Sequence, residues 1–390
     1  MRSILLTLAA QLCACGETKH EPQPESVMPE PAPQLPPRAE TADALAVEAF
    51  RHVVAQEEGN VVFSPASLEG LLHLLTGGAG GATRAELAAL PYGKQGVPSA
   101  VQVRSANALF ADEDVKLRPG VRDVQRAPML RNPARAANRI NTWCSEHTAG
   151  KIDSIITEAD VAEKRPRLLA LNAVHLKAQW IEPFKNSATH DGIFHAPGGP
   201  VTAPMMEQEE HLVYAEGADW QAVALLYRRD DRQGEPGCFI GILPKGNARE
   251  FAAKLTPQKW NSIRSALVKG GYRLVRVTLP RFEVRTDAFS LNSALQALGV
   301  RTAFTPAADF SGFAEGEALT LSDVKQKCYI IVDEKGTEAA AVTMAALRAV
   351  PIVPTPPKPK IIRFDRPFLW VVGDLATSAP PFFMGICERP

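Results

Sequence analysis

The residue types that usually carry catalysis occur in this sequence, but not at catalytic spacings. His175, His190, His195 and His211 form no H-E-x-x-H pattern, and no two cysteines form a C-x-x-C pair. No serine lies in a G-x-S-x-G elbow. The glycine-rich run 77–81 lacks the G-K-[ST] that completes a phosphate-binding loop, so it is interpreted as the end of a helix. The sequence therefore predicts neither an enzyme nor a metal or cofactor site.

A different kind of chemistry is indicated near the C-terminus, where residues 334–354 read E-K-G-T-E-A-A-A-V-T-M-A-A-L-R-A-V-P-I-V-P. The alanines suit a helix, although the prolines from Pro351 onward exclude a regular helix beyond them. With a period of two, the small residues instead share one face of a strand: Thr337, Ala339, Ala341, Thr343 and Ala345. Such a strand could slide between two existing strands without overpacking what lies beneath.

This stretch resembles the mobile hinge of the serpin family, whose reactive loop begins with an acidic residue, a Gly-Thr-Glu and a run of alanines. The matching residues are Glu334, Gly336, Thr337, Glu338, Ala339, Ala340, Ala341 and Thr343. The resemblance implies that a target serine or cysteine protease cleaves the loop, and that the freed hinge then inserts into a central sheet and traps the enzyme covalently. About a dozen new hydrogen bonds, at roughly 0.5–1.5 kcal/mol each, would supply on the order of 10 kcal/mol.

The resemblance covers residues 41–390 as one domain. It implies an α+β serpin fold, with several helices, three β-sheets including a large central sheet, and an exposed reactive-centre loop. Besides the hinge, it is carried by S-P-A-S at 64–67, by L-L-A-L-N-A-V-H-L-K-A-Q-W-I-E-P-F at 168–184, by A-D-F-S-G at 308–312, and by the C-terminal segments 364–368 and 381–385. The alternative to an inhibitor is a non-inhibitory serpin-fold protein with a binding or chaperone-like role. The small residues from Ala339 to Thr343 argue against it.

Six residues are assigned by the resemblance to the region where the sheet opens: Ser64, Ser67, Asn172, Trp180, Arg281 and Gln326. Arg281 is expected to pair with Glu334 and to hold the hinge out of the sheet, with a solvated strand charge as the alternative. Gln326 stands where many serpins have a histidine, so the polar network is expected to survive without its pH sensitivity. Val342 replaces the usual Ala or Gly, and slower insertion is expected.

The scissile bond is less sharply defined. Counting sixteen residues on from Glu334, as in the family, gives Val350–Pro351. A proline after the bond suits few serine proteases, and the loop is longer than usual before Phe364. Cleavage is therefore expected within a window whose alternatives favour trypsin-like, elastase-like or subtilisin-like enzymes: Arg348, Ala349, Val350, Pro351, Ile352 and Val353.

The N-terminus predicts export. Residues 1–15 have the pattern of a signal peptide and end in L-C-A-C-G, which resembles a bacterial lipoprotein cleavage box with Cys15 as the acylated residue. A plain secretory signal is the alternative. Residues 16–40 are rich in proline, a composition that favours an extended tether. The expected location is extracellular or periplasmic, with the chain tethered to a membrane surface as a lipoprotein.

Composition and segment lengths limit the partners. Lys+Arg and Asp+Glu balance at 43 each, so no nucleic-acid partner is expected. Residues 90–103 leave little room for the helix that binds heparin-like polyanions in some serpins, and no heparin activation is expected. The segment 119–133 is also short, which predicts that an edge strand is missing. A monomer is expected. Four cysteines are interpreted as buried thiols, with a disulfide left open: Cys144, Cys238, Cys328 and Cys387.

Overall fold

The computed structural model describes residues 41–92, 102–228, 237–316, 318–337, 358–375 and 380–390, all within the unit Pro37–Pro390. Most of its α-helices begin at a side-chain cap, and α2, α4 and α7 also have proline in the first turn. The helices in these residues are α1 (Ala42–Gln56), α2 (Pro65–Gly78), α3 (Gly81–Ala88), α4 (Pro133–His147), α5 (Glu158–Lys164), α6 (Ala248–Ala253), α7 (Pro257–Gly270) and α8 (Asn292–Ala297). None of the helices in this described part is long and apolar enough to cross a membrane.

The central sheet has seven strands, and its middle is a parallel pair. Its order is β10 (Phe282–Arg285), β12 (Leu321–Asp333), β13 (Gly336–Thr337), β4 (Leu168–Gln179), β2 (Gln102–Asp112) and β3 (Val124–Ala127), with β11 (Phe289–Ser290) also on β12. Residues 321–329 of β12 pair directly with residues 168–175 of β4. Beyond this stretch β13 lies between the two strands.

One expectation is wrong: the edge strand is present. Strand β3 pairs in parallel with β2, from Leu109 opposite Val124 to Asp112 opposite Ala127. The chain between them contains turns and no helix, so a short connection still leaves enough residues for the strand.

The second sheet has nine strands and accounts for the other two sheets that the resemblance implied. Its order is β1 (Val61–Phe63), β16 (Phe383–Cys387), β15 (Phe368–Gly373), β8 (Cys238–Pro244), β7 (Trp220–Leu226), β6 (Gly199–Glu216), β9 (Tyr272–Pro280) and β14 (Lys360–Arg363), with β5 (Thr189–Ala196) also on β6. Strand β6 pairs with β5 and β9 along most of its length and with β7 only at its end. Because β6 pairs with strands on both sides, the two further sheets that the resemblance implied are hydrogen-bonded into one sheet.

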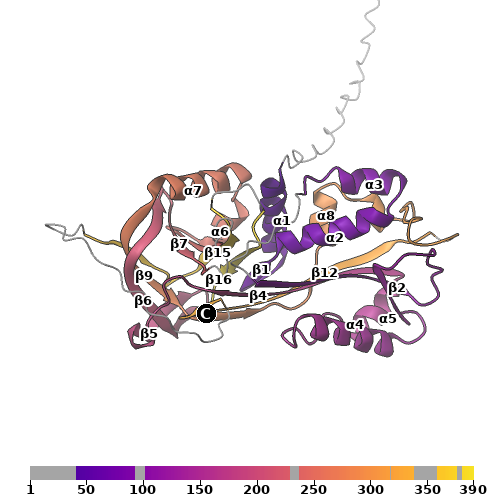
Figure 1. Cartoon of the computed structure of the whole chain (residues 1–390), viewed down its shortest axis with the longest axis horizontal. Helices are drawn as coiled ribbons and strands as arrows, with labels where there is room; N and C mark the ends of the chain where they lie inside the picture. Colours follow the sequence, from indigo (N-terminus) through magenta and orange to yellow (C-terminus); the bar gives the residue numbers. More distant parts are fainter. Residues whose placement is uncertain (1–40, 93–101, 229–236, 317, 338–357, 376–379) are drawn as a thin grey trace, which may run out of the picture. The chain divides into compact units, whose positions relative to one another are not determined.

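The two faces of the central sheet are covered differently (Figure 1). Helices α4 and α5 pack on one face, in a cluster with Leu169, Leu171 and Tyr329. On the other face, α2 packs beside Leu168 and Ala170. That face continues towards the second sheet, in a cluster that includes Val174 and Cys328. Because successive residues of a strand alternate between faces, residues inserted between β4 and β12 would alternate between these two environments.

Candidate functional site: the insertion point and the closed seam

The chain turns back into its own sheet directly after β12. The carboxylate of Asp333 accepts hydrogen bonds from the backbone N–H groups of Lys335 (2.8 Å) and Gly336 (3.1 Å), which fixes a tight turn. Thr337 then pairs with Val332 of β12 and with Ala178 of β4. Both residues of β13 are therefore paired with a strand on each side. We call β13 and the residues that contact it the insertion point.

Gly336 is required by the close approach of the backbones. A Cβ atom at this position would overlap the carbonyl oxygen of Ala178 and come within 2.8 Å of the Cα atom of Gln179. Thr337 is completely buried, and its hydroxyl is 2.7 Å from the hydroxyl of Tyr227. The sheet thus accepts a residue without a side chain first and a small, hydrogen-bonded residue next.

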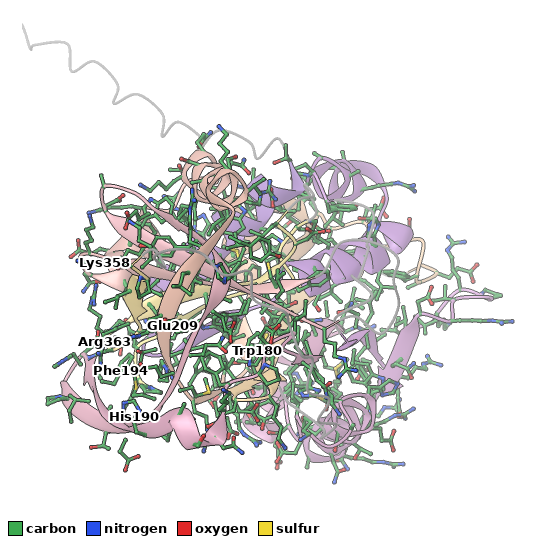
Figure 2. All side chains as sticks on the ribbon, turned by 60° about the vertical axis from the view of Figure 1, so that its left-hand side comes forward. Trp180, His190, Phe194, Glu209, Lys358 and Arg363 are labelled. Carbon is green, nitrogen blue, oxygen red and sulfur yellow. The ribbon has the colours of Figure 1, made fainter. Side chains whose placement is uncertain are left out.

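Trp180 holds the turn from the β4 side. Its indole N–H donates to the carbonyl of Asp333 at 2.9 Å, and its backbone N–H donates to the carbonyl of Lys335 at 3.0 Å. Its ring is buried and lies parallel to that of Tyr227, with centroids 4.8 Å apart. Figure 2 shows Trp180 well inside the side-chain envelope, whereas Lys358 and Arg363 lie towards its edge. Trp180 is therefore both a core residue and a direct support of the hinge.

Arg281 and Glu334 are in contact, as the resemblance implied. Their closest atoms, Nη2 and Oε1, are 2.5 Å apart, and the hydroxyl of Thr189 donates to the same carboxylate oxygen at 2.8 Å. Burial alone would raise the pKa of Glu334, but the hydrogen bonds from Arg281 and Thr189 hold that pKa below its ordinary value. The pair lies at the turn itself, and its proposed role in holding the hinge remains a prediction.

Below the insertion point, the polar residues of the sheet-opening region form one buried network. The amide of Gln326 accepts from the backbone N–H of Ser64 (2.8 Å) and donates to the side-chain oxygen of Asn172 (2.7 Å). The hydroxyl of Ser64 donates to the carbonyl of Phe382 (2.7 Å) and accepts, at 3.4 Å, from the backbone N–H of Ser67. All four predicted residues are buried. Gln326 and Asn172 face each other across the direct pairing of β12 and β4, the stretch that we call the closed seam.

Sequence reasoning missed Asn107, which extends this network. The side chain of Asn172 donates to that of Asn107, and the two residues are register partners in β4 and β2. An asparagine within the apolar run A-N-A-L-F was the available indication. Tyr227 and Asp333 were missed as well. The contacts of Tyr227 depend on strand register, whereas the turn at Asp333 is local, and D-E-K-G was the available indication.

The remaining predicted residues divide into two sets. Four cysteines are buried and unpaired, as expected for thiols, and burial raises their pKa values: Cys144, Cys238, Cys328 and Cys387. The other set lies outside the described residues: Cys15, Glu338, Ala339, Ala340, Ala341, Val342, Thr343, Arg348, Ala349, Val350, Pro351, Ile352 and Val353. No cluster of His, Cys, Asp and Glu suited to a metal ion occurs in the part that the structure describes.

The fold and the insertion point define a class of protein: α+β proteins in which the segment after a central strand turns back between that strand and its neighbour. The chain belongs to the serpin family. The family model, described as serpin (serine protease inhibitor), matches residues 40–390. The family is therefore one of inhibitors, and the chain is not an enzyme.

Individual relatives align with this chain over most of their length. A serpin-like protein of Thermococcus kodakarensis is 33% identical over 366 residues, covering 86% of this chain and 82% of the relative. Plasminogen activator inhibitor 1 of Bos taurus is 29% identical over 391 residues, covering 90% and 92%. Among solved structures, the thermophilic serpin tengpin in its native state aligns with a TM-score of 0.73 at 26% identity, covering 90% of this chain and 94% of that chain.

Proposed function

We propose that this serpin inhibits a serine-type endopeptidase as a suicide substrate. After cleavage within Arg348 to Val353, the hinge would insert as a new strand between β4 and β12 and trap the attached enzyme covalently. One observation carries the proposal: Gly336 and Thr337 already pair with both strands. Insertion then extends a strand that is already present, so no new strand has to be started between β4 and β12.

The register of β13 also fits the hinge sequence. Because Thr337 lies opposite Val332 and Ala178, the same register would place Thr343 between Gln326 and Asn172. Every second residue would face the buried side with Thr337: Ala339, Ala341, Thr343 and Ala345. These side chains are small enough to avoid overpacking, and the Thr343 hydroxyl can replace the hydrogen bond that insertion breaks between Gln326 and Asn172.

A protease panel tests the proposal. Trypsin-like, elastase-like and subtilisin-like enzymes are each mixed with the protein and examined by denaturing electrophoresis and mass spectrometry. An SDS-resistant complex, with a released C-terminal peptide beginning between Ala349 and Val353, is expected. Nicked protein should melt about 15 °C above intact protein, since the new strand adds on the order of 10 kcal/mol. Clean cleavage, an active protease and an unchanged melting temperature would instead indicate a non-inhibitory binding protein.

The export pattern supports a further part of the proposal: acylation at Cys15, with residues 16–40 as a tether on the outer side of a membrane. At about 3.1 Å per residue, an extended tether of this length would reach roughly 70 Å. Cys15→Ser should move the protein to the soluble fraction, whereas Cys13→Ser should leave it with the membrane. Equal fractionation of both variants would contradict the anchor.

We also propose that the protein acts as a monomer, and that it needs no heparin activation because the segment 90–103 is short. Elution from a heparin column below physiological salt and an inhibition rate unchanged by heparin are expected. Retention at physiological salt would contradict this.

A further inference from the structure

A pocket opens where β6 and β7 separate. These strands pair only along residues 213–216 of β6 and 221–224 of β7. Beyond Ala224, the carbonyl of Leu226 in β7 instead accepts a hydrogen bond from the backbone N–H of Ile181 at 2.9 Å. The pocket between the two strands, together with the open solvent at its mouth, contains about 490 Å³ of empty space. Trp180 forms part of its wall. The pocket is therefore a consequence of two strands that diverge beside the insertion point.

The lining of the pocket points to a ligand with an apolar ring. Leu212 and Leu225 are almost fully buried in its floor, as is Trp180. At the rim, Ile181 and Tyr272 are 42% and 60% exposed. These are two of the five large apolar side chains exposed in the described part of the chain. Paired exposed apolar residues above an apolar floor are typical of a binding site.

One polar group specifies the ligand further. Gln208 lines the pocket, and its side-chain Nε2 is buried and has no hydrogen-bond partner among the described residues. A buried donor without an acceptor is destabilising, so a ligand that supplies an acceptor gains affinity. Glu182 and His211 also line the pocket, and the negative charge of Glu182 disfavours an anionic acceptor. The favoured group is a neutral carbonyl beside an aromatic ring.

The same pocket contacts the support of the hinge. Trp180 donates to the carbonyls of Asp333 and Lys335, and it stacks on Tyr227, whose hydroxyl contacts Thr337. We infer that this pocket binds a small neutral aromatic carbonyl compound, and that the bound compound stabilises the Trp180 arrangement and slows insertion of the hinge. The effect on insertion rests on the proposed inhibitory function, whereas binding itself does not.

Acetophenone is a suitable probe, with ethylbenzene as its match in shape without the acceptor and benzoate as its anionic counterpart. In an NMR titration of ¹⁵N-labelled full-length protein, acetophenone should shift the Gln208 side-chain amide and the Trp180 indole signals, with a Kd of about 0.1–1 mM. Ethylbenzene should bind about fivefold more weakly, because it leaves the donor unpaired. Benzoate should bind more weakly than acetophenone.

Gln208→Met removes the donor while keeping a chain of similar length. It should abolish the preference for acetophenone over ethylbenzene, whereas Gln221→Met, outside the pocket lining, should retain it. Signals that shift only elsewhere would overturn the site, and equal binding of both ring compounds to the native protein would overturn the role of the donor. A Gln208→Met variant that keeps the preference would overturn the role of the donor.

The coupling has its own readout. The loop is nicked by a protease from the panel, and the conversion to the high-melting form is followed with and without acetophenone at ten times its Kd. At least a twofold slower conversion is expected. If the probe binds and the rate is unchanged, the coupling is wrong. If nicking yields no high-melting form, the inhibitory function fails, while the binding result still decides the site.

Discussion

The insertion point and the closed seam belong to the same two strands, yet they are held by different interactions. At the insertion point, β13 already separates β4 from β12, and the contacts support the turn: Trp180 with Asp333, and Arg281 with Glu334. Along the closed seam, the strands pair directly, and both faces are fastened. The Gln326–Asn172 network lies on one face, and ion pairs from α5 lie on the other, Lys164 with Asp323 and Asp160 with Lys325.

This difference locates the barrier to insertion. The insertion point is already open, whereas each new residue of the inserted strand from Tyr329 downward must replace direct pairing of β12 with β4. The boundary is marked by His175 and Tyr329, the last direct register pair, whose rings stack with centroids 5.6 Å apart. From Val332 down to Gln326 the inserted strand would travel roughly 20 Å at 3.3 Å per residue. Cleavage must therefore supply free energy mainly for opening the closed seam.

The largest expected effect comes from blocking the closed seam at Thr343. Thr343→Arg would bring a charge to the buried network of Gln326 and Asn172, at a cost of several kcal/mol. The loop should still be cleaved, but the SDS-resistant complex should fall at least tenfold. Val342→Ala is the matched control, because residue 342 falls on the other face of the inserted strand. It should form the complex at least as fast as the native protein. Complex formation by Thr343→Arg at the native level would contradict the register.

A substitution at Gly336 tests the insertion point itself. Gly336→Ala would drive a methyl group into the carbonyl of Ala178, and overpacking of this kind costs about 1–3 kcal/mol. The intact protein should melt a few degrees lower, by roughly 1.5 °C per kcal/mol for a domain of this size. Gly246→Ala is the control, since a Cβ atom there meets nothing within 4 Å. An unchanged melting temperature for Gly336→Ala would mean that β13 is not held between the strands.

The Arg281–Glu334 pair should contribute less, because the side chain of Arg281 is 48% exposed while that of Glu334 is 6% exposed. In a double-mutant cycle of Arg281→Met and Glu334→Gln, a coupling of about 1 kcal/mol in thermal stability is expected. The rate of spontaneous insertion in uncleaved protein, followed as loss of inhibition, should rise in each single variant. A coupling near zero would show that the Arg281–Glu334 pair contributes no more to stability than a solvated surface contact.

The sequence was sufficient for the fold class and for placing Trp180, Arg281 and Glu334 near the hinge turn, because those residues carry the family pattern. It was not sufficient for the contacts that depend on register. Asn107 joins the network only because β2 places it opposite Asn172. Asp160 was recognisable as part of a capped helix start, T-E-A-D, but nothing in the chain order shows that α5 reaches Lys325, more than 160 residues later. The presence of β3 likewise depended on how tightly the chain turns after β2.

The smallest expected effect concerns the ion pairs of α5, and its sign follows from the pKa of Asp160. Burial alone would raise that pKa, but hydrogen bonds from Thr157 and the charge of Lys325 lower it to about 2, from an ordinary value of 3.8. A carboxyl group with a lowered pKa in the folded state stabilises the fold above the ordinary pKa and loses this contribution as the pH falls towards 2.

Allowing for solvent screening, a stabilisation of about 1 kcal/mol by Asp160 is expected at pH 7, and roughly half of it at pH 3. Asp160→Asn should therefore lower the melting temperature by about 2 °C at pH 7 and by less at pH 3. Glu163→Gln, an exposed position of the same helix, should change it by less than about 1 °C at either pH. A deficit for Asp160→Asn that is constant with pH would contradict a charge-dependent role of this carboxylate, whereas a deficit that shrinks in acid supports its hydrogen bonds from Thr157 and its ion pair with Lys325.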